Sequence, residues 1–203
     1  MAKILYIDCE TTGLTPGKND IIQLSGLIEI DKEVKEEFNF KLKPLREENI
    51  QQQALDVQKR TKEEVMAFPD QKEAYEEFIK ILDKYCDKYK KDKQKEDRFF
   101  FAGHNVGFDV KFIMQWFKDN NNDYFGSYVN LNPKDFIDSL AIVRKYKKAL
   151  NLDNCKLHTV AQKLLGKDFE FKSHDALHDI YATKMCLEVL FELYPEHFPE
   201  EVK

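Results

Sequence analysis

The 203-residue chain contains little glycine and no closely spaced cysteines, and both absences limit what it can be. Seven glycines stand against sixteen phenylalanines and nine tyrosines, which excludes a fibrous or disordered chain and predicts a packed, aromatic-rich interior. The four cysteines lie far apart without a Cys-x-x-Cys pair. This spacing argues against a disulfide scaffold or a zinc knuckle and predicts buried, reduced thiols in an intracellular protein.

Long apolar runs and an excess of positive charge are also missing. No apolar stretch approaches the roughly 18 residues of a membrane span, and a carboxylate interrupts the short apolar run at the N-terminus, unlike in a signal peptide. We therefore expect a cytoplasmic protein without a membrane partner. The net charge of −5 does not favour nucleic-acid binding, unless bound divalent cations neutralise clustered carboxylates beside a phosphate. Two basic segments, 84–95 and 144–148, are candidate phosphate contacts, although a solvated helix face or loop is the default interpretation of each.

The order of predicted elements indicates an α/β fold. Runs of β-branched and aromatic residues predict strands at 3–8, 21–30, 36–44, 98–103 and the beginning of 135–146. Apolar residues at helical spacing predict helices over 70–89, from 106 to about 117, over the rest of 135–146, over 156–165 and over 175–194. Three leading strands followed by alternating helices and strands favour a mixed sheet. We expect a single domain over residues 1–203.

The first candidate site residues lie in the segment YIDCETTGL. Side chains alternate along a strand, so Asp8 and Glu10 should point to the same face while Cys9 points into the core. Two adjacent carboxylates repel each other unless a cation lies between them. Oxygen-only ligands favour Mg²⁺ or Mn²⁺ over Zn²⁺. Taken alone, a solvated strand end with two acids is an equally good interpretation.

A third acid follows the predicted strand at 98–103. The segment GHNVGFDVKF begins where this strand ends and a helix begins, so Asp109 should lie near the first turn of that helix. A single aspartate there usually makes only a favourable contact with the helix dipole. In this chain it would be brought to the same sheet edge as Asp8 and Glu10.

The segment SHDALHDIYAT contains two histidines and two aspartates, each pair four residues apart. On a helix, His174 and His178 would share one face, which is the spacing of a zinc metalloprotease helix. Asp175 then occupies the position of the catalytic glutamate, one methylene shorter. A zinc site would also leave the two earlier acidic segments unexplained, so we do not favour it.

DCETTGL, HNVGFD and HDALHD together resemble the three motifs of the DEDDh 3′→5′ exonuclease family, in the family's order and over nearly the whole chain. This family includes the epsilon proofreading subunit of the bacterial replicative polymerase, ribonuclease T and oligoribonuclease. The resemblance implies a ribonuclease H-like fold, with a mixed five-stranded sheet flanked by helices. It also implies two divalent cations, Mg²⁺ or Mn²⁺, held by four acids: Asp8, Glu10, Asp109 and Asp179.

The resemblance further implies a role for each site residue. Asp8 would bridge both cations, Glu10 and Asp179 would serve one, and Asp109 the other. His174, five residues before Asp179, would be the general base that activates a water. His178 would then be a packing residue and Asp175 a helix cap. The implied substrate contacts are Thr11, Thr12, Leu14 and Asn105, with His104 a weaker candidate; a core position is as plausible for Leu14 as a wedge against the terminal base.

The implied activity is the removal of nucleotides from single-stranded DNA 3′ ends by two-metal-ion phosphodiester hydrolysis, in proofreading or repair. A DNA polymerase would be a further partner, associated through the surface, because the chain ends at Lys203 without a long tail as a tether. Two alternatives stay open. No motif shows what contacts a 2′-hydroxyl, so the substrate could be RNA or short oligoribonucleotides. A non-catalytic, polymerase-associated scaffold is the second alternative, which the presence of all four acids disfavours.

Overall fold

The computed structural model describes residues 2–166, 169 and 176–203. One sheet contains the strands β1 (Lys3–Thr11), β2 (Ile21–Ile30), β3 (Glu33–Lys41), β4 (Phe99–Gly103) and β5 (Ile137–Asp138). Their order in the sheet is β3-β2-β1-β4-β5. β2 is antiparallel to both β1 and β3, whereas β4 is parallel to both β1 and β5. The predicted mixed, five-stranded sheet is therefore confirmed.

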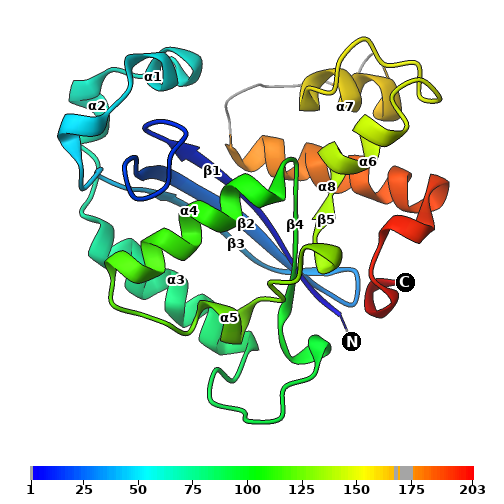
Figure 1. Cartoon of the computed structure of the whole chain (residues 1–203), viewed down its shortest axis with the longest axis horizontal. Helices are drawn as coiled ribbons and strands as arrows, with labels where there is room; N and C mark the ends of the chain where they lie inside the picture. The colour runs from blue at the N-terminus through cyan, green and yellow to red at the C-terminus, as the bar shows by residue number, and fades with distance from the viewer. Residues whose placement is uncertain (1, 167–168, 170–175) are drawn as a thin grey trace.

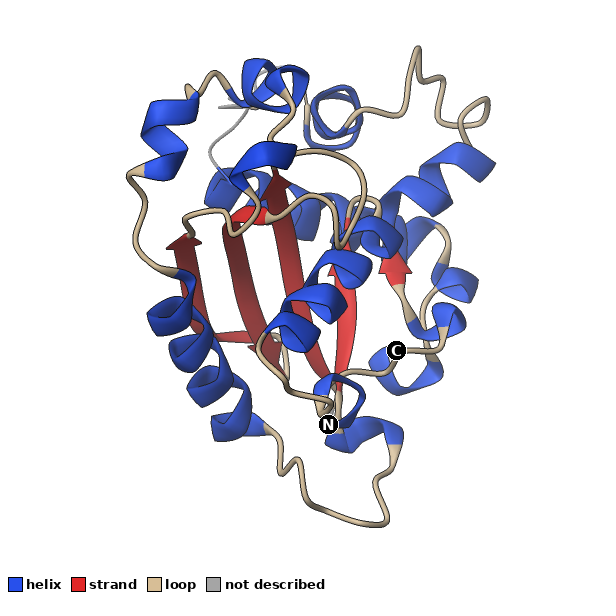
Figure 2. Ribbon diagram, turned by 60° about the vertical axis from the view of Figure 1, so that its left-hand side comes forward, coloured by secondary structure: helices blue, strands red, loops and turns tan. Residues whose placement is uncertain are grey.

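Helices cover both faces of this sheet (Figures 1 and 2). α3 (Gln71–Tyr85) and α4 (Val106–Asp119) pack on one face. α6 (Ser139–Lys145), α7 (Leu157–Leu165) and α8 (Ala176–Leu193) pack on the other. The remaining short helices are α1 (Gln52–Gln58), α2 (Lys62–Met66) and α5 (Phe125–Tyr128). Single 3-10 turns lie at Glu47–Asn49, Lys95–Asp97, Pro133–Asp135, Pro195–His197 and Glu200–Val202.

The alternation of side chains along β1 divides the core into two layers. Leu5, Ile7 and Cys9 pack with α3 and α4, whereas Ile4 and Tyr6 pack with α6, α7 and α8. β4 is buried along its whole length, as expected for a strand covered on both faces. Asp8 and Glu10 continue the Ile4–Tyr6 side of β1, so their side chains lie on the α8 face of the sheet.

The observed boundaries differ from the predicted ones where pairing or burial decides. β1 continues to Thr11, beyond the predicted end at Asp8, because residues 9–11 still pair with β2. α3 ends at Tyr85, so the predicted extension of its apolar stripe to Tyr89 was wrong; that ring is 68% exposed. The helices α1 and α2 were not predicted, because each buries only one large apolar side chain, Leu55 or Val65.

Helix ends elsewhere follow local capping. The Asp138 carboxylate accepts the Leu140 and Ala141 N–H groups at the start of α6, as an N-cap does. α7 ends at Gly166, whose φ of 108° suits glycine. The predicted start of α8 near Asp175 lies outside the described residues. No helix in the described part of the chain combines the length and hydropathy needed to cross a bilayer.

The parallel pair β1–β4 positions the candidate site. The chain proceeds from β1 to β2 and β3 on one side and from β4 to β5 on the other, so the strand order reverses between β1 and β4. Ligands of open α/β sheets bind at the carboxyl ends of strands at such a switch point. β4 pairs with β1 only from Lys3 to Tyr6, so the end of β1 that contains Asp8 and Glu10 projects beyond β4.

Candidate active site

Asp8 and Glu10 lie on the projecting end of β1, with neutral neighbours on the adjacent strand. Asp8 is directly opposite Ser25 of β2, and Glu10 is directly opposite Gln23. Directly opposite residues of an antiparallel pair share one face of the sheet. β2 therefore contributes no positively charged side chain at these two positions. The two acids on β1 repel each other.

Asp109 is tied to this strand by a hydrogen bond. Its side chain is buried in α4, and its Oδ1 accepts the backbone N–H of Cys9 at 3.0 Å. The connection from β4 to α4 turns sharply at Asn105, which has a φ of 88°. This turn places the first helical turn of α4 beside the end of β1. The third acid of the motif set is thus fixed to the backbone between the first two.

Asp179 belongs to the first turn of α8, which packs across β1 and β2. Its charge lies close enough to Glu10 to raise the pKa of that carboxyl. Asp8 in turn raises the pKa of both Glu10 and Asp109. The structure therefore brings the four acids singled out in the sequence into one electrostatically connected group, although they are scattered from residue 8 to residue 179.

Burial and mutual repulsion favour the protonated forms of these acids. Burial raises the pKa of Asp8 from 3.8 to about 6. Burial, followed by the charges of Asp8 and Asp179, raises the pKa of Glu10 from 4.5 to about 8, against the opposing effect of Arg60. Burial and the Asp8 charge also hold the pKa of Asp109 well above its ordinary range. A bound cation would reduce the repulsion among the ionised forms of these acids.

The donor set fits Mg²⁺ or Mn²⁺. All four side chains offer only oxygen ligands, which these hard cations prefer. Within the described residues, no three His, Cys, Asp or Glu side chains are arranged so that together they could hold one ion. Magnesium is usually held by one or two carboxylates, with water and substrate phosphates as the other ligands. Pairs such as Asp8 with Glu10 or Asp8 with Asp109 meet that requirement.

The raised pKa values predict how the stability of the metal-free protein depends on pH. The folded state holds these protons more tightly than the unfolded state, so the free energy of unfolding should fall as the pH rises from about 4 to about 8. Divalent cations bind the ionised acids, so added Mg²⁺ should raise the melting temperature more at pH 8 than at pH 5. Thermal unfolding in EDTA and in Mg²⁺ at both pH values measures this.

The variant Glu10→Gln is the control for this prediction. It removes the acid whose pKa is raised to about 8, so the fall in stability between pH 6 and pH 8 should become shallower. Equal stabilisation of the wild type by Mg²⁺ at pH 5 and pH 8 would contradict the prediction.

Two of the expected substrate contacts have hydroxyls that form hydrogen bonds within the protein. Thr11 and Thr12 are both buried. The Thr11 hydroxyl donates to the Gly13 carbonyl at 2.7 Å, and the Thr12 hydroxyl accepts the Asp20 N–H at 2.9 Å. Both hydroxyls therefore shape the turn between β1 and β2, and the contacts of Thr11 and Thr12 with substrate stay a prediction. By contrast, Leu14 is 77% exposed, so the alternative of a core leucine was wrong.

The two residues after β4 have different roles. Asn105 is exposed, and its backbone N–H donates to Asp138 Oδ1 at 3.0 Å. His104 is half-buried, with Nδ1 2.8 Å from Ser139 Oγ and Nε2 2.9 Å from the Cys155 carbonyl. Burial lowers the pKa of His104. We assign His104 a structural role in joining β4 to α6, in place of the expected phosphate contact.

The expected general base, His174, and the expected helix cap, Asp175, lie outside the described residues. His178 is on α8, with its ring 6.0 Å from that of Phe169. This contact fits the packing role expected of it, and the prediction that His174 has the catalytic role stays a prediction.

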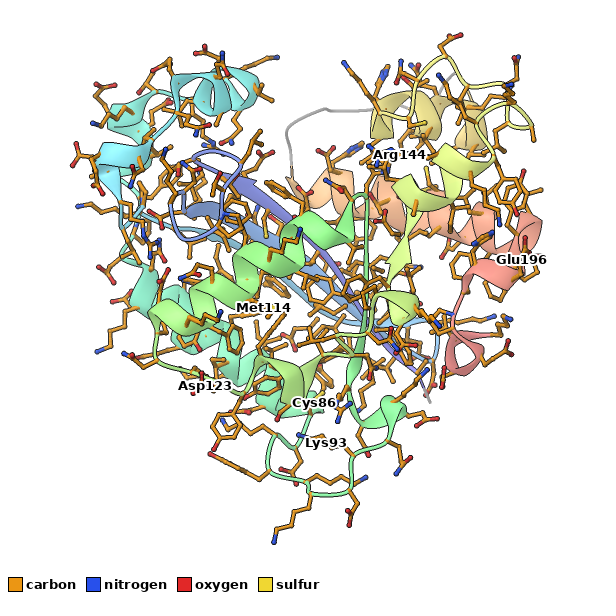
Figure 3. The ribbon with its side chains drawn as sticks, in the orientation of Figure 1. Cys86, Lys93, Met114, Asp123, Arg144 and Glu196 are labelled. Atoms are coloured by element: carbon orange, nitrogen blue, oxygen red, sulfur yellow. The ribbon has the colours of Figure 1, made fainter. Side chains whose placement is uncertain are left out.

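The basic segment 84–95 lies away from the acids, near the amino end of β4, where Figure 3 labels Lys93. Four of its six lysines form ion pairs within the protein: Lys84 with Glu36, Lys88 with Asp83, Lys90 with Asp97, and Lys95 with Asp135 and Glu201. We therefore do not assign it a phosphate contact. Arg144 of the second basic segment is exposed on α6 (Figure 3), near enough to His104 to lower the pKa of that imidazole.

Two residues near the acids had no signal in the sequence. Gln23 faces Glu10 across the β1–β2 pair, and Arg60 hydrogen-bonds to Gln23. Arg60 lies between α1 and α2, the two helices that periodicity did not predict. Its position relative to Glu10 depends on contacts between distant segments, so a pattern of nearby residues could not have found it.

Comparisons with known proteins point to a family of exonucleases. The sequence model of the exonuclease family RNase_T matches residues 5–187. The chain is 27% identical to a PolC-type DNA polymerase III of Thermotoga petrophila and 28% identical to that of Thermotoga maritima, in each case over 90% of this chain and 11% of the relative. It thus spans about a ninth of the length of these relatives.

Solved structures of exonuclease I share the fold. One matches with a TM-score of 0.73 at 20% identity, over 98% of this chain and 42% of the other. Another, of the E. coli enzyme with a dA16 oligonucleotide, matches with a TM-score of 0.71 at 20% identity, over 98% of this chain and 42% of that one. These matches confirm the predicted ribonuclease H-like fold. With the family match over nearly the whole length, they show that the chain belongs to the exonuclease family, as a DEDD-type 3′→5′ exonuclease member.

Proposed function

We propose that this protein removes nucleotides one at a time from the 3′ ends of single-stranded DNA by hydrolysing phosphodiester bonds. The observation that carries the proposal is the hydrogen bond from Cys9 N–H to Asp109 Oδ1. It fixes an acid from α4 between Asp8 and Glu10, at the switch point of the sheet. Proofreading or repair would be the setting, and residues 1–203 would act as one domain.

Two divalent cations, Mg²⁺ or Mn²⁺, are part of the proposal, whereas divalent-metal use in general is a property of the family. Asp8, Glu10, Asp109 and Asp179 would hold them. When bound, such cations stabilise the negative charge on the attacking and leaving oxygens of a phosphoryl displacement. Four carboxylates with two divalent cations carry no net formal charge, so the site can accept an anionic phosphodiester.

The protein's own residues would divide the remaining work. His174 would accept the proton of the attacking water, because a neutral imidazole is an effective base near pH 7. The exposed Leu14 side chain would pack against the terminal base, and Asn105 would contact the phosphate path. The Thr11–Thr12 turn would contribute its shape, held by its own buried hydroxyls.

The preference for DNA and the association with a polymerase rest on similar proteins. The PolC-type relatives are DNA polymerases, and exonuclease I has been solved with DNA oligonucleotides. We propose by analogy that this protein acts on DNA and works beside a polymerase.

A 5′-labelled oligonucleotide assay in Mg²⁺ tests the proposal. We expect a ladder that shortens from the 3′ end, release of nucleoside 5′-monophosphates, and faster cleavage of DNA than of RNA of the same sequence. Asp8→Ala is the inactive control. If the wild type were as inert as Asp8→Ala on both DNA and RNA, the enzymatic function would be rejected. Faster cleavage of RNA would replace the DNA substrate with an RNA one.

A further inference from the structure

Two cationic side chains lie on the face of the sheet that contains the acids: Arg60, whose charge acts on Glu10, and Lys41, two strands away from Glu10. Glu10 of β1 is directly opposite Gln23 of β2, which is directly opposite Lys41 of β3. These three side chains therefore form a row across the sheet on one face. Arg60 joins the row from the α1–α2 connection, donating its Nη2 to Gln23 Oε1 at 2.7 Å. The row leads from the acids to the edge strand β3.

Arg60 and Lys41 both lie against one aromatic ring. The guanidinium carbon of Arg60 is 5.2 Å from the ring centroid of Phe68, and Lys41 Nζ is 5.5 Å from it. Neither side chain forms an ion pair with a carboxylate in the described part of the chain. The buried Nε of Arg60 also has no hydrogen-bond partner among the described residues. Two like charges on one ring, neither of them paired with a carboxylate, are suited to an anion.

The backbone around Arg60 is held in place. Lys59 ends α1 in the left-handed conformation, and the Arg60 N–H donates to the Leu55 carbonyl at 3.0 Å. Gln58 Nε2 donates to the Thr11 carbonyl at 2.9 Å, which ties α1 to the end of β1. Thr61 then begins α2 with a capping box. The segment that contains Arg60 is thus tied to the strand that contains the acids, and its guanidinium to the neighbouring strand β2.

We propose that Arg60 and Lys41 form a phosphate-binding subsite for the single strand whose 3′ end is cleaved. This inference rests on the proposed function and extends it to the path of the substrate. A guanidinium offers a planar set of N–H donors to phosphate oxygens, and Lys41 adds a point charge. Phe68 keeps both cationic groups on the sheet face. The strand would run from the acids past Gln23 towards the edge of β3.

Binding measurements on three variants test this subsite. Arg60→Ala, Lys41→Ala and the double variant are compared with the parent by anisotropy of a labelled DNA oligonucleotide in Mg²⁺, in the His174→Ala background that slows cleavage. We expect Arg60→Ala to raise Kd by about 10- to 100-fold, the value of a charge-assisted hydrogen bond. The salt dependence of log Kd should become shallower by roughly 0.7 for each phosphate that the variant no longer neutralises. In the otherwise wild-type enzyme, KM should rise while kcat changes little.

Controls separate this role from folding and from support of Glu10. Lys72→Ala removes an exposed charge from α3, on the opposite face of the sheet, and should leave Kd unchanged. Arg60→Lys should keep the fold and part of the affinity, with melting temperatures verifying the fold of each variant. A methylphosphonate replaces one phosphate by a neutral group and can be moved along the oligonucleotide. At one linkage it should weaken binding to the parent, and at that same linkage it should leave binding to the double variant unchanged.

Two results would overturn the subsite. One is an unchanged Kd and salt dependence in the double variant. The other is that Arg60→Ala changes only the Mg²⁺ concentration that the enzyme requires and leaves Kd for the oligonucleotide unchanged. Arg60 would then act through Glu10. A wild-type enzyme that shortens DNA, combined with either result, rejects the subsite alone. A wild type that is inert on DNA and RNA rejects the proposed function itself.

Discussion

Replacing Asp8 by asparagine should reduce nucleotide release by at least about 10³-fold, because Asp8 is one of the four acids proposed to hold the cations. Metal ions contribute several kcal/mol of charge stabilisation in such reactions, and about 1.4 kcal/mol corresponds to a factor of ten. The same substitution should make the metal-free protein more stable at pH 8. It removes a carboxyl whose pKa burial raises to about 6 and which repels Glu10 and Asp109. The opposite directions of the two effects distinguish a site residue from a structural one.

The measurements are the rate of shortening of a 5′-labelled oligonucleotide in Mg²⁺ and the melting temperature in EDTA. Asp123→Asn is the matched control, because Asp123 is an exposed aspartate between α4 and α5 (Figure 3). It should change neither quantity. An Asp8→Asn variant that cleaves at nearly the wild-type rate would remove Asp8 from the proposed metal ligands. A variant that lost activity because it unfolded would show a lower melting temperature, contrary to the expected rise.

The second large effect should separate the two histidines of the last motif. His174→Ala should lower kcat by at least about 100-fold, the low end for the loss of a general base. His178→Ala should cost little activity, because His178 lies against Phe169 and is proposed to have no part in the chemistry. The two variants remove the same side chain four residues apart, so each serves as the control for the other.

The pH dependence of kcat adds a test that a structural role would not pass. If His174 is the base, the rise of log kcat through the imidazole range near pH 6.5 should disappear in His174→Ala. His178→Ala should retain it. A loss of activity in His178→Ala with little change in His174→Ala would reverse the assignment.

The sequence alone was sufficient for the class of fold, and it singled out the four acids that are proposed to hold the metal ions. Both depend on local patterns: β-branched and aromatic runs for the strands, and fixed spacings within DCETTGL, HNVGFD and HDALHD. The period of two along β1 also placed Asp8 and Glu10 on one face. The limit of such local patterns is visible at Tyr89: the helical spacing of apolar residues continues to this position, although α3 ends at Tyr85.

Only the tertiary structure decided how the acids meet and which neighbours take part. The bond from Cys9 N–H to Asp109 joins residues 100 positions apart, and the Thr12 hydroxyl is used by the turn that Asp20 closes. His104 contacts Ser139 and Cys155, which lie in distant segments of the chain. Arg60 lies beside Gln23 because the fold brings their two segments together. Local spacing records which residue types are present, whereas the partner of each polar group depends on where the packing of the whole core brings distant segments together.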